Sequence, residues 1–110
     1  MKIIKTVPEM GSLSRQARGQ GKKIVFVPTM GALHEGHLAL FRDGKKRGDL
    51  VVVSIFVNPT QFNDPRDFAK YPRDLQKDLA ACRAEMVDLV FAPSPEEMYP
   101  DGFKIDAWNH

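Results

Sequence analysis

Two histidines stand three positions apart, beside two glycines, in the segment VPTMGALHEGH at residues 27–37. Gly31 allows the backbone to turn sharply, and Gly36 leaves no side chain at the start of a helix, where free N–H groups and the helix dipole favour an anion such as phosphate. His34 and His37, at positions i and i+3, can both face that anion. Each imidazole can donate a hydrogen bond to a phosphoryl oxygen and adds positive charge when protonated. The segment therefore predicts a phosphate-binding loop.

Two other interpretations of these histidines stay open. They could ligate a metal ion, although no third ligand stands at a telling spacing and no cysteine accompanies them. They could also be surface residues that cap a helix. The segment is not a Walker A loop, because no Gly-Lys-Ser/Thr follows it, and it does not fit the dinucleotide-binding fingerprint. Its position with two glycines directly after an apolar run favours the anion site.

A second group of polar residues follows the next apolar run. Asn58 and Gln61 offer amide donors and acceptors in a loop stiffened by Pro59, and we predict that they face a small polar substrate. The alternative is that Asn58-Pro59 is ordinary turn chemistry and that Gln61 is a surface side chain. Tyr71 is either a packing residue or a ligand contact, and Met30 is either a core residue or a pocket wall. Sequence spacing does not separate these alternatives.

Apolar runs alternate with helical patterns, which predicts an α/β fold. The runs are unbroken and suit strands that are covered on both faces of a parallel sheet. Thr6 precedes the first helix as its cap. The predicted elements in chain order are a helix at residues 7–18, a strand at 24–27, a helix at 37–47, a strand at 50–57, a helix at 74–85 and a strand at 87–92.

The two polar groups fall where these strands end. In open parallel sheets, ligands bind outside the carboxyl ends of the strands. The predicted strands are followed by residues 28–31, 58–61 and 92–95, and the first two of these segments carry glycine or polar side chains. We therefore expect the histidines and the amides to meet at one edge of the sheet.

Composition and charge argue against nucleic acid and membranes as partners. Sixteen basic and fourteen acidic residues give the 110-residue chain a net charge of +2, which is too weak to indicate either one. The first residues lack the apolar core of a secretory leader and the longest apolar stretch is too short to span a bilayer, so we expect neither secretion nor membrane insertion. Cys82 is the single cysteine, which excludes an intrachain disulfide and fits a reducing cytosol. We expect one folded unit in the cytoplasm.

Two long blocks, VPTMGALHEGHLAL and VVVSIFVNPTQFNDPRDFAKYPRDLQKD, are followed in order by FAP and MYP. Together they closely resemble the pantoate-β-alanine ligase (pantothenate synthetase) family of the nucleotidylyltransferase superfamily, with its His-x-Gly-His type signature. The resemblance covers roughly residues 1–103. It implies a Rossmann-like, doubly wound parallel sheet of the nucleotidylyltransferase type, here an incomplete N-terminal part.

The resemblance also implies a two-step, ATP-dependent reaction. The carboxylate of pantoate attacks the α-phosphorus of ATP to give pantoyl adenylate and pyrophosphate, and the amine of β-alanine then displaces AMP to give pantothenate. Mg²⁺ neutralises the phosphates. The implied partners are therefore ATP, pantoate, β-alanine and, because the family is typically dimeric, a second copy of the chain in a homodimer.

Carried over residue by residue, the resemblance makes His37 the proton donor and places His34 beside it at the phosphates. Gln61 matches the residue that binds pantoate and lies near β-alanine, while Met30, Asn58 and Tyr71 line the same pocket. No residue is matched to a metal-ligand role. The segment implied to bind ATP consists of Met30, Gly31, Ala32, Leu33, His34, Glu35, Gly36 and His37.

The chain also departs from the family pattern. Family members are more than twice this length, and the later strands, a lysine-bearing loop and the smaller C-terminal domain have no counterpart here. Residues 104–110 predict a divergent or foreign tail. In the usual sheet order the first predicted strand is central, so we expect its outer edge to lack a partner and the chain to self-associate or to be marginally stable.

Three functions stay open at this point. The chain is the ATP- and pantoate-binding portion of such a ligase, or a non-catalytic nucleotide-binding or self-associating module. A third interpretation is a nucleotidylyltransferase with another acceptor, which the block FVNPTQF disfavours.

Overall fold

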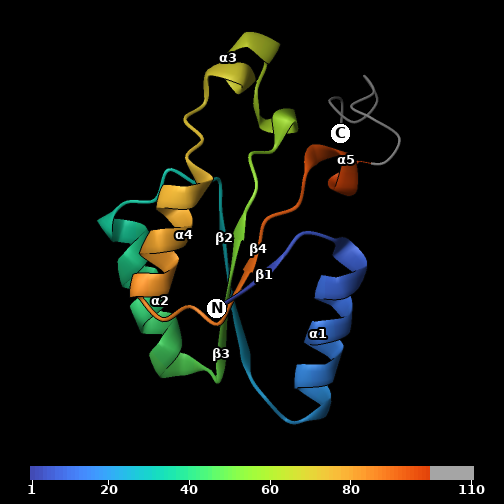
Figure 1. Ribbon diagram of the computed structural model, residues 1–110, viewed down its shortest axis with the longest axis vertical. Coiled ribbons are helices and arrows are strands. Elements are labelled where there is room, and N and C mark those ends of the chain that lie inside the picture. The colour runs from blue at the N-terminus through green and yellow to red at the C-terminus, as the bar shows by residue number, and fades with distance from the viewer. Residues whose placement is uncertain (100–110) are drawn as a thin grey trace.

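Four parallel strands form one sheet in the part of the chain that the computed structural model describes, residues 1–99 (Figure 1). The predicted tail at residues 104–110 lies outside the described part. Neighbouring strands are parallel in all three pairings, so the predicted α/β class with a parallel sheet is confirmed. The strands are β1 (Lys2–Ile4), β2 (Ile24–Thr29), β3 (Leu50–Ile55) and β4 (Leu89–Phe91), and their order across the sheet is β1-β4-β3-β2.

Helices cover both faces of this sheet. In Figure 1, α2 (Glu35–Arg47) and α4 (Leu75–Ala84) lie on one face and α1 (Val7–Gly19) lies on the other. Three short helical segments lie beyond the carboxyl ends of the strands, namely η1 (Pro59–Gln61), α3 (Pro65–Lys70) and α5 (Pro95–Met98). Within residues 1–99, no helix combines the length and the apolar character that crossing a membrane requires.

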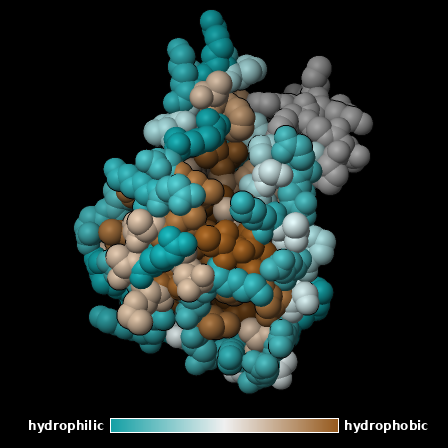
Figure 2. All heavy atoms as spheres, in the orientation of Figure 1, coloured by the Kyte–Doolittle hydropathy of each residue, from teal (hydrophilic) through white to brown (hydrophobic). Residues whose placement is uncertain are grey.

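Strand β3 is the centre of the core. Its side chains alternate between the two faces, as strand geometry requires. Val51 and Val53 pack in the cluster between the sheet and α2 and α4, together with Phe41, whereas Val52 packs with Met10 of α1. Figure 2 shows apolar residues gathered between the two helical layers, with hydrophilic residues around them. Burial on both faces explains why this strand is an unbroken apolar run.

The predicted strands exist, but their ends differ from the prediction. β2 continues through Pro28 and Thr29, which pair with Ser54 and Ile55. A proline is tolerated there because β2 is an edge strand, where a missing N–H donor does not break a ladder. β3 ends at Ile55, two residues before the predicted end at residue 57, because β2 offers it no partner beyond Thr29. The third predicted strand shortens to β4, whose three residues match the length of β1, its partner on one side.

All three predicted helices exist, and the predicted ends agree better for α1 and α4 than for α2. α1 begins at Val7 with Thr6 as its cap, whose side chain accepts from Glu9 N at 3.4 Å. α4 agrees with the predicted 74–85 to within one residue at each end. The crossover helix begins at Glu35 rather than at the predicted residue 37.

The sequence pattern predicts no strand before the first helix, and this is wrong. Lys2–Ile4 pairs in parallel with β4 and forms the far edge of the sheet. Three residues are too short to show a period of two, so this strand is set by its pairing and by the burial of Ile4 rather than by local pattern.

The other edge of the sheet is formed by β2. Among residues 1–99, no strand pairs with its outer side, as expected for this strand. Phe26 lies on β2 with 52% of its surface exposed, which is unusual for a large aromatic side chain in a sheet. β2 therefore presents an open backbone edge with an apolar side chain beside it.

Candidate functional site

The loop between β2 and α2 follows an unusual backbone path. Gly31 has φ of +78° and Ala32 has φ of +50°, both in the left-handed region. The sharp turn predicted at Gly31 is confirmed, and it continues through Ala32. A non-glycine residue is strained there and persists only when its surroundings hold it.

Side chains hold this turn by accepting its N–H groups. Gly31 N donates to Thr29 Oγ1 at 3.2 Å. Ala32 N and Leu33 N donate to Oδ2 and Oδ1 of Asp78, each at 3.0 Å. Asp78 belongs to α4, 45 residues from Leu33, and is 4% exposed. Neither Thr29 nor Asp78 is predicted from the sequence, because nothing in its spacing relates residue 78 to this loop.

The two histidines cap helix α2. His34 Nδ1 accepts from Gly36 N, and His37 Nδ1 accepts from His34 N, both at 3.1 Å. This reciprocal arrangement is a capping box in which imidazoles replace the usual hydroxyl and carboxylate groups. Histidine is not among the residues that signal a helix start, which is why the predicted start at residue 37 is wrong. The helix-capping interpretation of the pair is confirmed.

Capping also decides which ring nitrogen carries the proton. Each Nδ1 accepts an N–H and is therefore unprotonated, so the proton of each neutral ring lies on Nε2. The ring centroids are 4.2 Å apart. No residue within 1–99 accepts from either Nε2–H. His34 and His37 can therefore donate two neighbouring hydrogen bonds to one anion while they cap the helix.

Gly36 has a different role from the predicted one. A Cβ at this position would lie 2.8 Å from His34 Cε1, so glycine makes room for the capping imidazole. The N–H groups of the first turn are also less free than predicted, because Gly36 N donates to His34 and His37 N donates to the carbonyl of His34 at 2.9 Å. An anion is therefore expected to contact the imidazoles rather than these N–H groups.

Burial affects the protonation of His37. It lowers the pKa of His37 below its ordinary value of 6.5, neighbouring His34 lowers the pKa further, and the carboxylate of Asp78 opposes both. Protonation of a partly buried ring next to another imidazole is unfavourable. At neutral pH, His37 is therefore a neutral hydrogen-bond donor rather than a cation.

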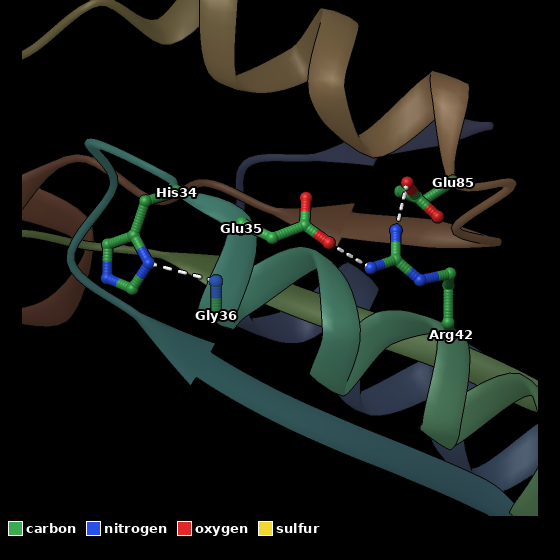
Figure 3. A network of polar contacts seen from close by, with 5 residues as sticks. All are labelled: His34, Glu35, Gly36, Arg42 and Glu85. Carbon is green, nitrogen blue, oxygen red and sulfur yellow. Dashed lines mark hydrogen bonds and ion pairs between the residues drawn. The ribbon is translucent and has the colours of Figure 1, made fainter.

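An ion-pair network ties the first turn of α2 to α4 (Figure 3). Arg42 pairs with Glu35 and, at 2.7 Å, with Oε1 of Glu85 at the end of α4. Figure 3 shows the carboxylate of Glu35 pointing toward Arg42 and away from the ring of His34. Exposed ion pairs add little stability, so the network chiefly orients Glu35.

An open cavity of about 580 Å³ lies where β2 and β3 end. Thr29 and Ile55 are register partners, so the loops that follow them start at the same level. The cavity thus brings together residues from the two predicted polar groups. Its lining consists of Pro28, Thr29, Met30, Gly31, Ala32, His34, His37, Ser54, Phe56, Asn58, Gln61 and Tyr71.

Three residues of the predicted ATP-binding segment do not line this cavity. Leu33 packs against the core cluster, Glu35 pairs with Arg42, and Gly36 accommodates the ring of His34. Met30 is half-buried and forms part of the cavity wall.

Asn58 combines the two roles that the sequence left open. Its Oδ1 accepts from Thr60 N at 3.0 Å and from Thr60 Oγ1 at 2.7 Å, which is the predicted turn chemistry. The same oxygen accepts from Tyr99 Oη at 3.0 Å. Gln61 follows three residues after Asn58, is exposed, and lines the cavity. Asn58 therefore shapes the loop that carries Gln61.

Tyr71 ends an arm, residues 62–71, that projects beyond the sheet at α3 (Figure 1). Its ring packs edge-on against Phe62 with centroids 5.8 Å apart. Arg73 lies over the ring of Phe68 and donates to the carbonyls of Phe68, Ala69 and Tyr71, at 2.6, 3.4 and 3.2 Å. Tyr71 is thus both a packing residue and part of the cavity wall.

Among residues 1–99, no three His, Cys, Asp or Glu side chains gather as a metal site. Asp78 already uses both carboxylate oxygens on backbone N–H groups. A magnesium ion at this cavity would therefore depend on the phosphates of a nucleotide for most of its ligands, which is a common arrangement for Mg²⁺.

The parallel sheet and its crossover helix define a Rossmann-like α/β protein, with an open cavity at the carboxyl edge of its strands. The sequence matches the family described as pantoate-beta-alanine ligase over residues 2–109. The chain belongs to this family.

Named relatives and solved structures agree. The chain is 56% identical to the pantothenate synthetase of Syntrophotalea carbinolica and 54% identical to that of Geobacter sulfurreducens, over 94% of this chain and 37% of each relative. A pantoate-beta-alanine ligase from Francisella tularensis, complexed with beta-gamma ATP and beta-alanine, superposes with a TM-score of 0.85 at 47% identity, over 93% of this chain and 39% of that one. The chain thus spans just over a third of the length of these proteins.

The lowered pKa of His37 leads to a prediction about pH. An NMR titration of the His37 imidazole should give a midpoint below 6.5. Because folding disfavours protonation, the contribution of His37 to stability is complete above pH 6.5 and is lost as the pH falls through the lower pKa of the folded chain. A midpoint at or above 6.5 would contradict this account of the ring.

Proposed function

We propose that this chain is the ATP- and pantoate-binding portion of a pantothenate synthetase. The observation that carries the proposal is the single cavity that His34, His37 and Gln61 line together, with no acceptor for either imidazole Nε2–H among residues 1–99. Membership of the pantoate-beta-alanine ligase family and the likeness to a structure complexed with beta-gamma ATP and beta-alanine support it.

In the proposed reaction, a carboxylate oxygen of pantoate forms a bond to the α-phosphorus of ATP as the bond to pyrophosphate breaks. The nitrogen of β-alanine then forms an amide with the activated carboxyl carbon, a proton leaves the nitrogen, and AMP departs. His34 and His37 donate hydrogen bonds to phosphoryl oxygens, where charge accumulates in the transition state. The bound phosphates raise the proton affinity of His37, which suits its proposed role as proton donor.

The remaining predicted residues bind and orient the substrates in this proposal. Residues 30–37 form the ATP-binding segment, Met30 is an apolar wall, and Gln61 hydrogen-bonds pantoate close to the position of β-alanine. Asn58 and Tyr71 shape the pocket around Gln61. Mg²⁺ enters with ATP as the counter-ion of its phosphates, since residues 1–99 offer no separate site for it. We propose that residues 1–103 belong to one nucleotide-binding unit, that residues 104–110 are a divergent or foreign tail, and that the protein acts in the cytoplasm.

The first test is ATP binding and turnover by the 110-residue chain with pantoate, β-alanine and magnesium. ATP binding should be measurable by calorimetry, and AMP and pantothenate should appear in equal amounts. His37→Ala should weaken ATP binding about tenfold, because it removes one hydrogen bond to a charged group. His37→Gln, which keeps an N–H donor near the position of Nε2, should retain most of the affinity.

Several outcomes of this experiment would redirect the proposal. ATP binding without pantothenate would identify a non-catalytic nucleotide-binding module. ATP binding without pantoate binding would favour a nucleotidylyltransferase with another acceptor. Unchanged ATP affinity in folded His37→Ala would contradict the role of this residue.

Gln61 gives a second, substrate-specific test. Gln61→Ala should weaken pantoate binding about tenfold and leave ATP binding nearly unchanged, because only the amide contact to pantoate is lost. Calorimetric titrations with each ligand measure the two effects separately. Gln16→Ala, an exposed glutamine on α1, is the matched control and should change neither. Equal losses for both ligands would point to misfolding instead.

We also propose that the chain forms a homodimer. The open edge of β2 and the exposed ring of Phe26 support this, because unpaired strand edges tend to pair with another chain. Sedimentation velocity over a concentration series should show a dimer, and Phe26→Lys should shift it toward monomer. A monomer at every concentration would refute the proposal.

A further inference from the structure

We propose that Asp78 is a positioning residue that clamps the turn at residues 31–33 from behind and thereby sets where His34 meets the phosphates. The part of this inference that concerns phosphates rests on the proposed function. The clamp itself rests on contacts within the chain.

The carboxylate of Asp78 accepts two consecutive N–H groups. Oδ2 accepts from Ala32 and Oδ1 from Leu33, both at 3.0 Å. A carboxylate can do this because its two oxygens are equivalent acceptors in one plane, and hydrogen bonds to a charged acceptor are stronger than neutral ones. Asp78 is 4% exposed, so water does not compete for these contacts.

The turn needs such support. Ala32 has φ of +50°, which costs a non-glycine residue about 1 kcal/mol or more. The fit is also steric, because a Cβ at Gly31 would lie 3.0 Å from Asp78 Oδ2 and 3.3 Å from Ile55 Cγ2. Gly31 therefore lets the carboxylate approach the backbone, in addition to allowing the turn. Gly31 and Asp78, which are far apart in the sequence, therefore stabilise the turn together.

Asp78 acts through the loop rather than on a ligand. It does not line the open cavity that holds His34 and His37. It lines a second cavity, of about 190 Å³, which shares Met30, Gly31 and Phe56 with the first. Asp78 is therefore not among the residues that surround His34 and His37 in the proposed ligand site.

A chain of contacts leads from the clamp to the histidines. Leu33 N is held by Asp78, His34 follows directly in the sequence, and His34 N donates to His37 Nδ1. Releasing the turn would free the backbone at His34 and loosen the capping box at the start of α2. The Nε2–H groups of His34 and His37 would then lose their fixed spacing, although both residues would still be present.

The test compares two Asp→Asn variants of the same helix in the 110-residue chain. Asp78→Asn keeps the shape of the side chain but replaces one acceptor oxygen with an NH₂ group, so at least one of Ala32 N and Leu33 N loses its partner. Asp74→Asn is the matched control, because Asp74 is an exposed cap of α4 whose side chain, within residues 1–99, accepts only from Lys77 N, at 3.1 Å.

Amide hydrogen exchange measured by NMR is the decisive result. In Asp78→Asn, the amides of Ala32 or Leu33 should exchange at least tenfold faster, while the amides of β3 keep their wild-type rates. ATP should bind about tenfold more weakly than to wild type. Asp74→Asn should leave both the loop amides and the affinity for ATP unchanged. Wild-type exchange rates at both loop amides in folded Asp78→Asn would overturn the clamp.

A second measurement covers the case in which Asp78→Asn unfolds. In the wild-type chain, scalar couplings across the hydrogen bonds should connect the amide nitrogens of Ala32 and Leu33 with Cγ of Asp78. The absence of these couplings in the wild-type chain would overturn the clamp, so this measurement needs no variant. If wild-type chain fails to bind ATP, the proposed function fails, while exchange and couplings still decide the clamp. If the loop loosens but ATP affinity is unchanged, the link from the clamp to the phosphates is refuted.

Discussion

The site depends on a single constraint, which is that the backbone N–H groups between β2 and α2 find acceptors in a turn that is neither strand nor helix. The N–H groups of residues 31–33 are buried or partly buried, and an unpaired buried N–H group costs about 1–3 kcal/mol. Here Thr29, Asp78, His37 and His34 supply acceptors for the N–H groups at residues 31–34 and 36. The same contacts fix the orientation of both imidazoles. Stability of the loop and geometry of the site therefore have the same physical origin.

Most of the fold could be predicted because its signals are local. The unbroken apolar run at β3 reflects burial on both faces, and the helices at α1 and α4 carry capping residues of the expected kind. β1 could not be predicted, because a three-residue strand has no periodicity and is stabilised by β4, which lies at the other end of the described chain. The end of β3 is likewise decided by the length of its partner β2.

The site shows the same division between local and distant information. His34, His37 and Gln61 stand out by type and by position after strands, and the structure places them around one cavity. Asp78 does not stand out, because it lies in an ordinary amphipathic helix and becomes important only through a contact across 45 residues. Helix capping by the two histidines was one of the open interpretations, but the reciprocal capping box could not be predicted, because sequence rules assign that task to hydroxyl and carboxyl groups.

Gly31 and Gly36 were both predicted to matter in this loop, but the structure gives each a role beyond the predicted one. Gly31 permits positive φ, as the sequence suggests, but it also leaves space for the carboxylate of Asp78. Gly36 does not open the helix end to an anion, because the ring of His34 already occupies that place. The imidazole of His34 thus accepts the N–H of Gly36, as a phosphate would in a glycine-rich loop. Its own Nε2–H stays available to donate, since no residue within 1–99 accepts from it. In the proposed function, the ring of His34 therefore carries a hydrogen-bond donor from the start of the helix toward the anion.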